Sequence, residues 1–109
     1  MLIQILDAVG SNQTVIVKAQ EAVVDKSASI VATNTAQDLA AANVNRNGFV
    51  MQNLGANDMY VSDVGPADAG VTSFKVSPGA FWPPADYPVS TGAISVYGTA
   101  NDVAVAREW

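Results

Sequence analysis

The chain has 109 residues, with 10 Asp or Glu against 5 Lys or Arg, so its formal net charge is −5. Phosphate backbones repel such an acidic chain, which disfavours free nucleic acid as a partner. The absence of cysteine and histidine excludes disulfides, thiolate chemistry and the commonest general base and metal ligand at neutral pH. The length fits one domain covering residues 1–109.

The N-terminal forty residues begin with a short apolar strand at residues 2–6. Residues 14–18 are β-branched and alternate, which predicts a second strand, with residues 21–25 as its continuation past a bend. A further strand is expected at 29–33. Residues 34–43 contain one large apolar residue, Leu39, so we expect an extended or single-turn connection there.

No targeting or membrane segment is expected. The first residues lack a basic region, and their apolar run is too short for a signal peptide. No stretch approaches the length of a transmembrane helix. The sequence therefore predicts a chain that is made in the cytoplasm, stays soluble there until it is incorporated elsewhere, and has no membrane partner.

The C-terminal part is a series of short alternating runs separated by turn residues. The first two runs, joined at Gly55-Ala56-Asn57, predict a hairpin. Inward positions are expected for Phe74 and Val76 and for Ile94 and Val96. The predicted strands are residues 49–54, 58–63, 73–76, 93–97 and 103–107.

This spacing of strands and turns is typical of an all-β fold. We expect a single-domain antiparallel β-sandwich or jelly roll of about eight strands. At most one short helical turn is expected.

Carboxylates are the only catalytic chemistry that the composition leaves open. Asp58, Asp63 and Asp68 are five residues apart, with Pro66 in between. A calcium loop requires oxygen ligands at alternating positions, so turn formation explains these aspartates better. The sequence predicts no catalytic residue, no metal site and no cofactor. A carboxylate-based hydrolase is the least favoured of three hypotheses.

The best interaction candidates lie in the Pro-rich segment 81–88. It carries Phe81, Trp82 and Tyr87 among three prolines. A rigid backbone lowers the entropic cost of aromatic contacts, and aromatic residues are enriched in binding hot spots. The alternative is that Phe81 and Trp82 plug one end of the sandwich. Trp109 likewise either closes the core or docks on a neighbouring subunit.

Two further sets of residues are candidates for an interface. Leu2, Ile3 and Ile5 belong to a terminal strand, and an exposed strand edge invites pairing with another subunit. Arg46 lies in the polar turn 45–48. It either ties this turn to a strand end, which is the favoured reading, or contacts a partner.

Four segments together resemble small β proteins encoded among the structural genes of tailed bacteriophages. They are residues 41–53 (AANVNRNGFVMQN), 59–61 (MYV), 77–79 (SPG) and 91–96 (TGAISV). The resemblance implies a virion protein with a sandwich or jelly-roll fold, of the capsid decoration (cement) type. Such a protein is expected on the capsid surface as a dimer or trimer, with itself and the major capsid protein as partners.

The chain departs from well-known trimeric decoration proteins, whose N-terminal arm is disordered, because its first six residues read as an ordered strand. That arm mechanism is therefore not expected here. A second hypothesis is a tail or fibre β module that binds a host glycan or another virion protein. In that case Trp82 and Tyr87 would form a sugar-stacking platform.

Overall fold

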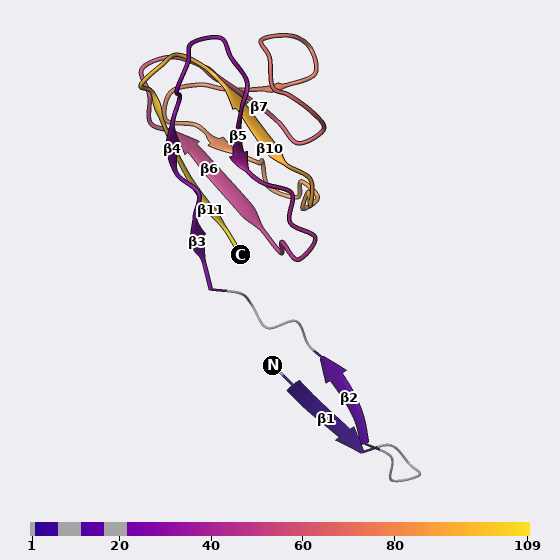
Figure 1. Cartoon of the computed structure of the whole chain (residues 1–109). Coiled ribbons are helices and arrows are strands. Elements are labelled where there is room, and N and C mark those ends of the chain that lie inside the picture. The colour runs from indigo at the N-terminus through magenta and orange to yellow at the C-terminus, as the bar shows by residue number, and fades with distance from the viewer. Residues whose placement is uncertain (1, 7–11, 17–21) are drawn as a thin grey trace.

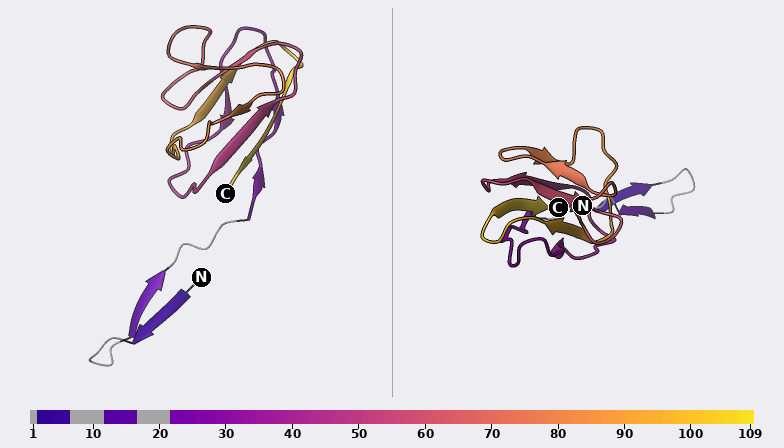
Figure 2. Two further views of the ribbon diagram at one scale, coloured as in Figure 1. Left: turned by 180° about the vertical axis from the view of Figure 1, so that it is seen from behind. Right: turned by 90° about the horizontal axis from the view of Figure 1, so that it is seen from above.

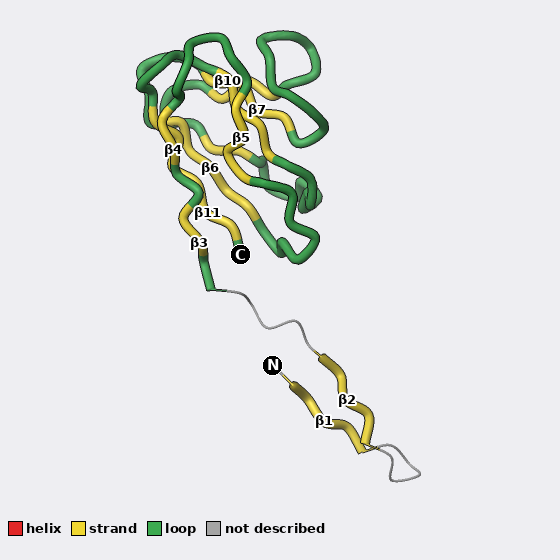
Figure 3. The backbone as a smooth tube through the Cα atoms, in the orientation of Figure 1, coloured by secondary structure: helices red, strands yellow, loops and turns green. Residues whose placement is uncertain are grey.

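The computed structural model describes residues 2–6, 12–16 and 22–109, and these contain strands and loops but no helix (Figure 1, Figure 3). Nine strands form two antiparallel sheets that pack as a single-domain β-sandwich. The prediction of an all-β sandwich is confirmed.

The first sheet has five strands, in the order β3–β11–β6–β9, with β4 also pairing with β11. The second sheet has four strands, in the order β5–β10–β7–β8. Figure 2 shows the sandwich from behind and from above. The strands of the five-stranded sheet are β3 (Val24–Asp25), β4 (Ala28–Ser29), β6 (Phe49–Asn53), β9 (Phe81–Trp82) and β11 (Val103–Glu108). Those of the four-stranded sheet are β5 (Gln37–Ala40), β7 (Met59–Ser62), β8 (Phe74–Val76) and β10 (Ile94–Tyr97).

Strands β1 (Leu2–Leu6) and β2 (Asn12–Ile16) form a separate two-stranded antiparallel sheet, the N-terminal hairpin. Its register places Leu2 opposite Ile16 and Ile3 opposite Val15. In Figure 1 this hairpin is drawn beyond the end of the sandwich at which the C-terminus lies. The strand predicted at 2–6 is confirmed, whereas the second strand begins two residues earlier than expected.

The core lies between the two sheets and follows the alternation of the strands. In β6 and β11 every second residue is buried, and in β10 the predicted inward positions Ile94 and Val96 are fully buried. Alternating residues of a strand point to opposite faces of the sheet, so each inner face is apolar. The buried core comprises Ile30, Leu39, Ala40, Phe49, Met51, Met59, Val61, Val76, Trp82, Ile94, Val96, Ala104 and Ala106.

The predicted hairpin between residues 49–54 and 58–63 is wrong. Strand β6 pairs with β11 and β9, whereas β7 pairs with β10 and β8, so the turn between them carries the chain from one sheet to the other. The buried side chain of Asn53 holds this turn: its Oδ1 accepts from the N–H of Gly55 at 2.8 Å. Its Nδ2 donates to the carbonyls of Asn57 at 2.7 Å and Val76 at 2.9 Å. Asn53 therefore links both sheets.

Three smaller predictions also need correction. The connection 34–43 contains strand β5, because Leu39 and Ala40 are buried against the core and β5 pairs with β10. The strand expected at 29–33 is short and ends at Ser29. Phe74, which was predicted to point inward, is 43% exposed.

The predicted turn at residues 77–80 is present. The N–H of Ala80 donates to the carbonyl of Ser77 at 2.9 Å, and Gly79 has a φ of +83°. This left-handed conformation favours glycine, and Pro78 before it suits a type II turn.

Candidate functional site

Arg46 lies inside the protein, where it joins the 45–48 turn to the last strand. Its Nε donates to Oε2 of Glu108 at 2.9 Å, and only 3% of Arg46 is exposed. Its other nitrogens donate to three backbone carbonyls, those of Ala41 (2.7 Å), Ser90 (2.7 Å) and Gly92 (2.8 Å). All three guanidinium nitrogens thus donate to groups within the chain. Of its two predicted roles, the structure places Arg46 in the structural one and leaves it no free face for a partner.

Glu108 is the buried partner of Arg46 and has two further neighbours. Lys26 Nζ lies 3.5 Å from Oε1, and Asn43 Nδ2 donates to the same oxygen at 3.5 Å. Burial raises the pKa of this carboxyl, but the hydrogen bond and charge of Arg46, with help from Lys26 and Asn43, outweigh it and hold the pKa below its ordinary value. Glu108 is therefore ionised and structural.

Trp82 is the hub of an aromatic cluster at one end of the sandwich. Its ring centroid lies 5.5 Å from that of Tyr87, 6.0 Å from Phe74 and 6.1 Å from Phe49. Trp82 is 3% exposed, whereas its neighbour Phe81 is 63% exposed, as expected for adjacent residues of one strand. Trp82 thus has no exposed ring for a sugar to stack on, and Phe81 is the more exposed of the two.

A pocket of about 210 Å³ lies beside this cluster. Trp82, Tyr87, Phe49 and Trp109 are among the residues that line it. The indole N–H of Trp82 is buried and has no hydrogen-bond partner.

Tyr87 is half-buried, and its hydroxyl donates to Oδ2 of Asp63 at 2.9 Å. Burial and the neighbouring carboxylate, to which the hydroxyl is bonded, raise the pKa of Tyr87 above its usual range. This bond ties the Pro-rich segment to the end of β7. The role of Tyr87 in the described structure is to fix that segment.

Trp109 closes the end of β11 against the 45–48 turn. Its N–H donates to the carbonyl of Gly48 at 3.1 Å, and its carbonyl accepts from the N–H of Gly48 at 3.0 Å. A Cβ at position 48 would overlap the indole ring, so glycine is required for this close approach. The structure places half-buried Trp109 on its own domain.

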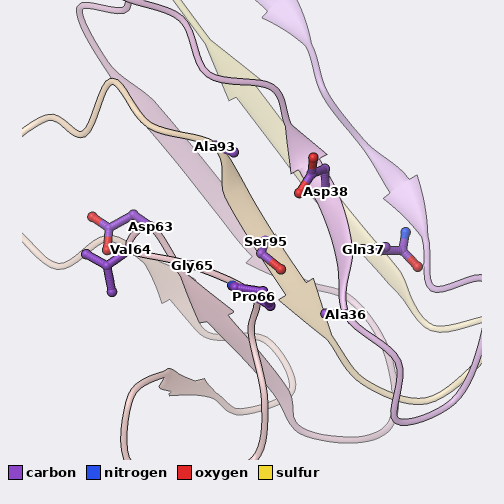
Figure 4. Close-up of a pocket in the computed structure, with 9 residues that line it drawn as sticks. All are labelled: Ala36, Gln37, Asp38, Asp63, Val64, Gly65, Pro66, Ala93 and Ser95. Atoms are coloured by element: carbon purple, nitrogen blue, oxygen red, sulfur yellow. The ribbon is translucent and has the colours of Figure 1, made fainter.

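A groove of about 610 Å³ runs along β10 (Figure 4). Ser95 lies in its middle, and the carboxylates of Asp38 and Asp63 lie on opposite sides of the strand. Residues 36–38, at and just before the start of β5, form one wall, and residues 63–66 form the other.

In the described part of the chain, no three Asp, Glu, His or Cys residues gather in a way that could hold a metal ion. Nor does that part contain a helix able to span a membrane.

On the outer face of the five-stranded sheet, several apolar residues lie near one another. Val50, Leu54, Phe81, Val103 and Val105 share this solvent side, and we call them the outer sheet face. Val105 pairs with Gln52, which pairs with Phe81, and the N–H of Leu54 donates to the carbonyl of Val103. Leu54 is 55% exposed and Val103 37%. An antiparallel sheet that faces water normally carries polar residues there. Here Gln52 and Arg107, the cross-strand neighbours of Phe81 and Val50, lie among the apolar residues.

The remaining candidates, Leu2, Ile3 and Ile5, lie in β1, whose backbone alone is described. Their strand pairs with β2 and with no other strand in the structure's described ladders. By register, Ile3 and Ile5 share one face of the hairpin with Val15, and Leu2 lies on the other.

Sequence reasoning missed three residues that organise the fold, namely Glu108, Asn53 and Gln37. Gln37, at the start of β5, bonds to the backbone at and just after β4. Its Oε1 accepts from the N–H of Val31 at 2.8 Å, and its Nε2 donates to the carbonyl of Ser29 at 3.0 Å. Glu108 carried a detectable signal, because it continues the inward alternation of Ala104 and Ala106. A charged residue at such a position requires a buried partner.

No protein-family model, no curated protein and no solved structure matches this chain. The resemblance to tailed-phage structural proteins therefore remains a prediction from the sequence segments given above.

Proposed function

We propose that this protein is a structural component of a bacteriophage virion, a homo-oligomeric decoration (cement) protein that binds the outer face of the capsid shell. The observation that carries the proposal is the set of exposed apolar residues on the outer sheet face. Phe81 is 63% exposed, Leu54 55% and Val103 37%. Exposed apolar surfaces of this kind mark sites of protein interaction.

The rigidity of the sandwich supports the same proposal. The Arg46–Glu108 pair holds the last strand, and the Asn53 side chain holds the sheet-to-sheet turn. Such a body presents its surfaces in a fixed geometry, which lowers the ordering cost of each contact.

Weak contacts suffice for a protein that coats a shell. When several linked copies bind neighbouring sites, each contact after the first is effectively intramolecular. An oligomer built from this chain would therefore bind a regular shell far more tightly than one chain alone.

The test uses shells assembled from the major capsid protein encoded by the genes that flank this one. Purified protein is mixed with expanded shells, and the shells are sedimented. We expect co-sedimentation that saturates at a fixed number of copies per capsomer, and shells that resist heat better. Protein that stays in the supernatant at micromolar concentration contradicts the proposal, and so does selective binding to a glycan array.

Two matched variants locate the contribution of the apolar surface. Phe81→Asp places a charge on the outer sheet face, whereas Val71→Asp places the same charge on a fully exposed valine in the 64–72 loop. We expect the first to weaken shell binding by at least about tenfold through lost multivalency, and the second to bind like the parent chain.

A further inference from the structure

We propose that the side chains of Lys26 and Asn43 join in an intramolecular amide bond, with Glu108 as the catalytic residue that moves the proton. The bond forms once, within a single chain, and does not depend on the decoration function. Lys26 Nζ and Asn43 Nδ2 each lie 3.5 Å from the same carboxylate oxygen, Oε1 of Glu108. An amine nucleophile, an amide and a carboxylate base therefore meet at one point.

Asn43 is held in place as the electrophile. Its Oδ1 accepts from the N–H of Asn45 at 3.0 Å, and its backbone N–H donates to the carbonyl of Thr91 at 2.8 Å. A backbone N–H that is aimed at a carbonyl oxygen stabilises the negative charge that develops there during attack. The leaving nitrogen, Nδ2, faces Glu108. Both ends of this amide thus have the partners that acyl transfer requires.

Lys26 is the nucleophile, and it is the least fixed of the three groups. Its side chain is 30% exposed, whereas that of Glu108 is 8% exposed. A lysine amine sits on a flexible four-carbon stem. Small rotations of this stem bring Nζ to the separation of about 3–3.5 Å from Cγ of Asn43 at which bonds form.

Glu108 is in the protonation state that the first step needs. Burial raises the pKa of its carboxyl, but Arg46 outweighs burial by donating to Oε2 at 2.9 Å and keeps the group ionised. The other oxygen, Oε1, is the one that faces Lys26 and Asn43. Arg46 therefore positions the carboxylate while Oε1 takes part in proton transfer.

The reaction is balanced by these side chains alone. Oε1 of Glu108 accepts a proton from the Lys26 ammonium, and the neutral Nζ attacks Cγ of Asn43 to form a C–N bond. Glu108 then gives its proton to Nδ2, the Cγ–Nδ2 bond breaks, and ammonia leaves. The excess proton on Nζ departs through Glu108, so that the products are a secondary amide, an ammonium ion and an unchanged carboxylate.

The bond ties together the edges of the two sheets. Lys26 directly follows β3, an edge strand that pairs with β11 over only two residues. Asn43 lies three residues after β5, the edge strand of the other sheet. A covalent link between them restricts the unfolded chain, as a disulfide does. A chain without cysteine thereby gains a cross-link by other chemistry.

A tryptic peptide map of the full chain detects this bond. Trypsin cuts after Lys18, Lys26 and Arg46, so an unlinked chain gives the separate peptides 19–26 and 27–46. Trypsin does not cut after an acylated lysine, so a linked chain gives one peptide, 19–46, that is lighter by one ammonia. We expect this peptide from folded protein incubated at neutral pH, and not from protein kept in guanidinium chloride.

Three variants assign the roles. Lys26→Arg keeps a positive charge beside Glu108 but has no amine nucleophile, so it should not lose ammonia. Lys75→Arg is the matched control, because Lys75 pairs with Asp58 instead, and it should link like the parent chain. Glu108→Gln should link at least about a hundredfold more slowly, since general acid–base catalysis contributes that much or more.

Four results overturn the inference. Separate peptides 19–26 and 27–46 at full mass, from folded parent protein after incubation, show that no bond forms. Ammonia loss confined to peptide 47–75 indicates cyclisation at Asn47-Gly48 instead. Ammonia loss from peptide 27–46 of Lys26→Arg indicates a different nucleophile. A folded Glu108→Gln variant that links as fast as the parent removes Glu108 from the step; if this variant does not fold, the peptide maps of the parent, Lys26→Arg and Lys75→Arg still decide whether the bond exists.

Discussion

Replacing Arg46 by methionine should destabilise the protein more than any change to a surface charge. The substitution keeps an unbranched apolar stem but removes the donor to Glu108 and to the three carbonyls of Ala41, Ser90 and Gly92. Removing one partner of a buried ion pair costs about 3–5 kcal/mol, because the other charge stays buried and unpaired. A domain of this size has a stability of about 5–15 kcal/mol, so the loss is a large fraction of it.

The assay is urea unfolding followed by tryptophan fluorescence, since Trp82 lies in the core and reports on the sandwich. With an m-value of about 2 kcal/mol/M, a loss of about 4 kcal/mol lowers the unfolding midpoint by about 2 M. Arg107→Met is the matched control: it removes the Arg107–Asp25 pair, whose side chains are 42% and 66% exposed. Exposed pairs contribute little, so its midpoint should stay close to that of the parent chain.

The same variant has a characteristic pH dependence. In the parent chain the pKa of Glu108 is held below its ordinary value of 4.5, so the stabilisation is present above that pH and is lost as the pH falls through the folded-state pKa. Without Arg46, burial acts largely unopposed and raises the pKa of Glu108, so acid neutralises the buried charge. The stability difference between variant and parent should therefore shrink between pH 7 and pH 4. A difference that is equal at both pH values, or a midpoint matching that of Arg107→Met, would refute the reasoning.

Two further substitutions test residues that shape the ends of the sandwich. Asn53→Ala removes three hydrogen bonds of a buried side chain at about 1 kcal/mol each, so its urea midpoint should fall by about 1.5 M. A fall no larger than that of the exposed Asn57→Ala would contradict the linking role. Gly48→Ala forces the ring of Trp109 away from the turn. Acrylamide should therefore quench tryptophan fluorescence more efficiently in this variant than in the control Gly92→Ala. Equal quenching in both variants would show that the ring does not rest on Gly48.

The sequence predicts the strands whose alternation is regular. Ile94 and Val96 are buried as expected, and strands β6 and β11 lie within a residue of their predicted ends. These elements combine period-two apolar residues with flanking turn residues, and both signals are local. The all-β class follows from them.

What the sequence does not reveal is which sheet each strand joins. The turn after β6 has the composition of a hairpin, yet Asn53 bonds to Val76 on the opposite sheet. Likewise, Arg46 meets Glu108 across 62 positions of sequence. Tertiary pairing of this kind leaves no local pattern, so the sequence predicts a structural role for Arg46 in the turn but does not identify Glu108 as its partner.

Which of the two rings, Phe81 or Trp82, points into the core also depends on the register of β9. Both are large aromatic residues, and composition cannot say which one points inward. Once β9 is paired with β6, Trp82 lies opposite the buried Met51 and Phe81 opposite the outward Gln52. The ladder therefore decides which ring packs in the core and which is left on the outer sheet face.

Edge protection distinguishes the sandwich from the hairpin. An unprotected strand edge pairs with other chains, and proteins prevent this with charges or prolines at the edge. Edge strand β8 carries Lys75, edge strand β5 carries Asp38, and Pro83 and Pro84 follow β9 directly. The hairpin strands contain neither a charge nor a proline. The sandwich edges thus carry features that oppose pairing with another chain, whereas the strands of the hairpin do not.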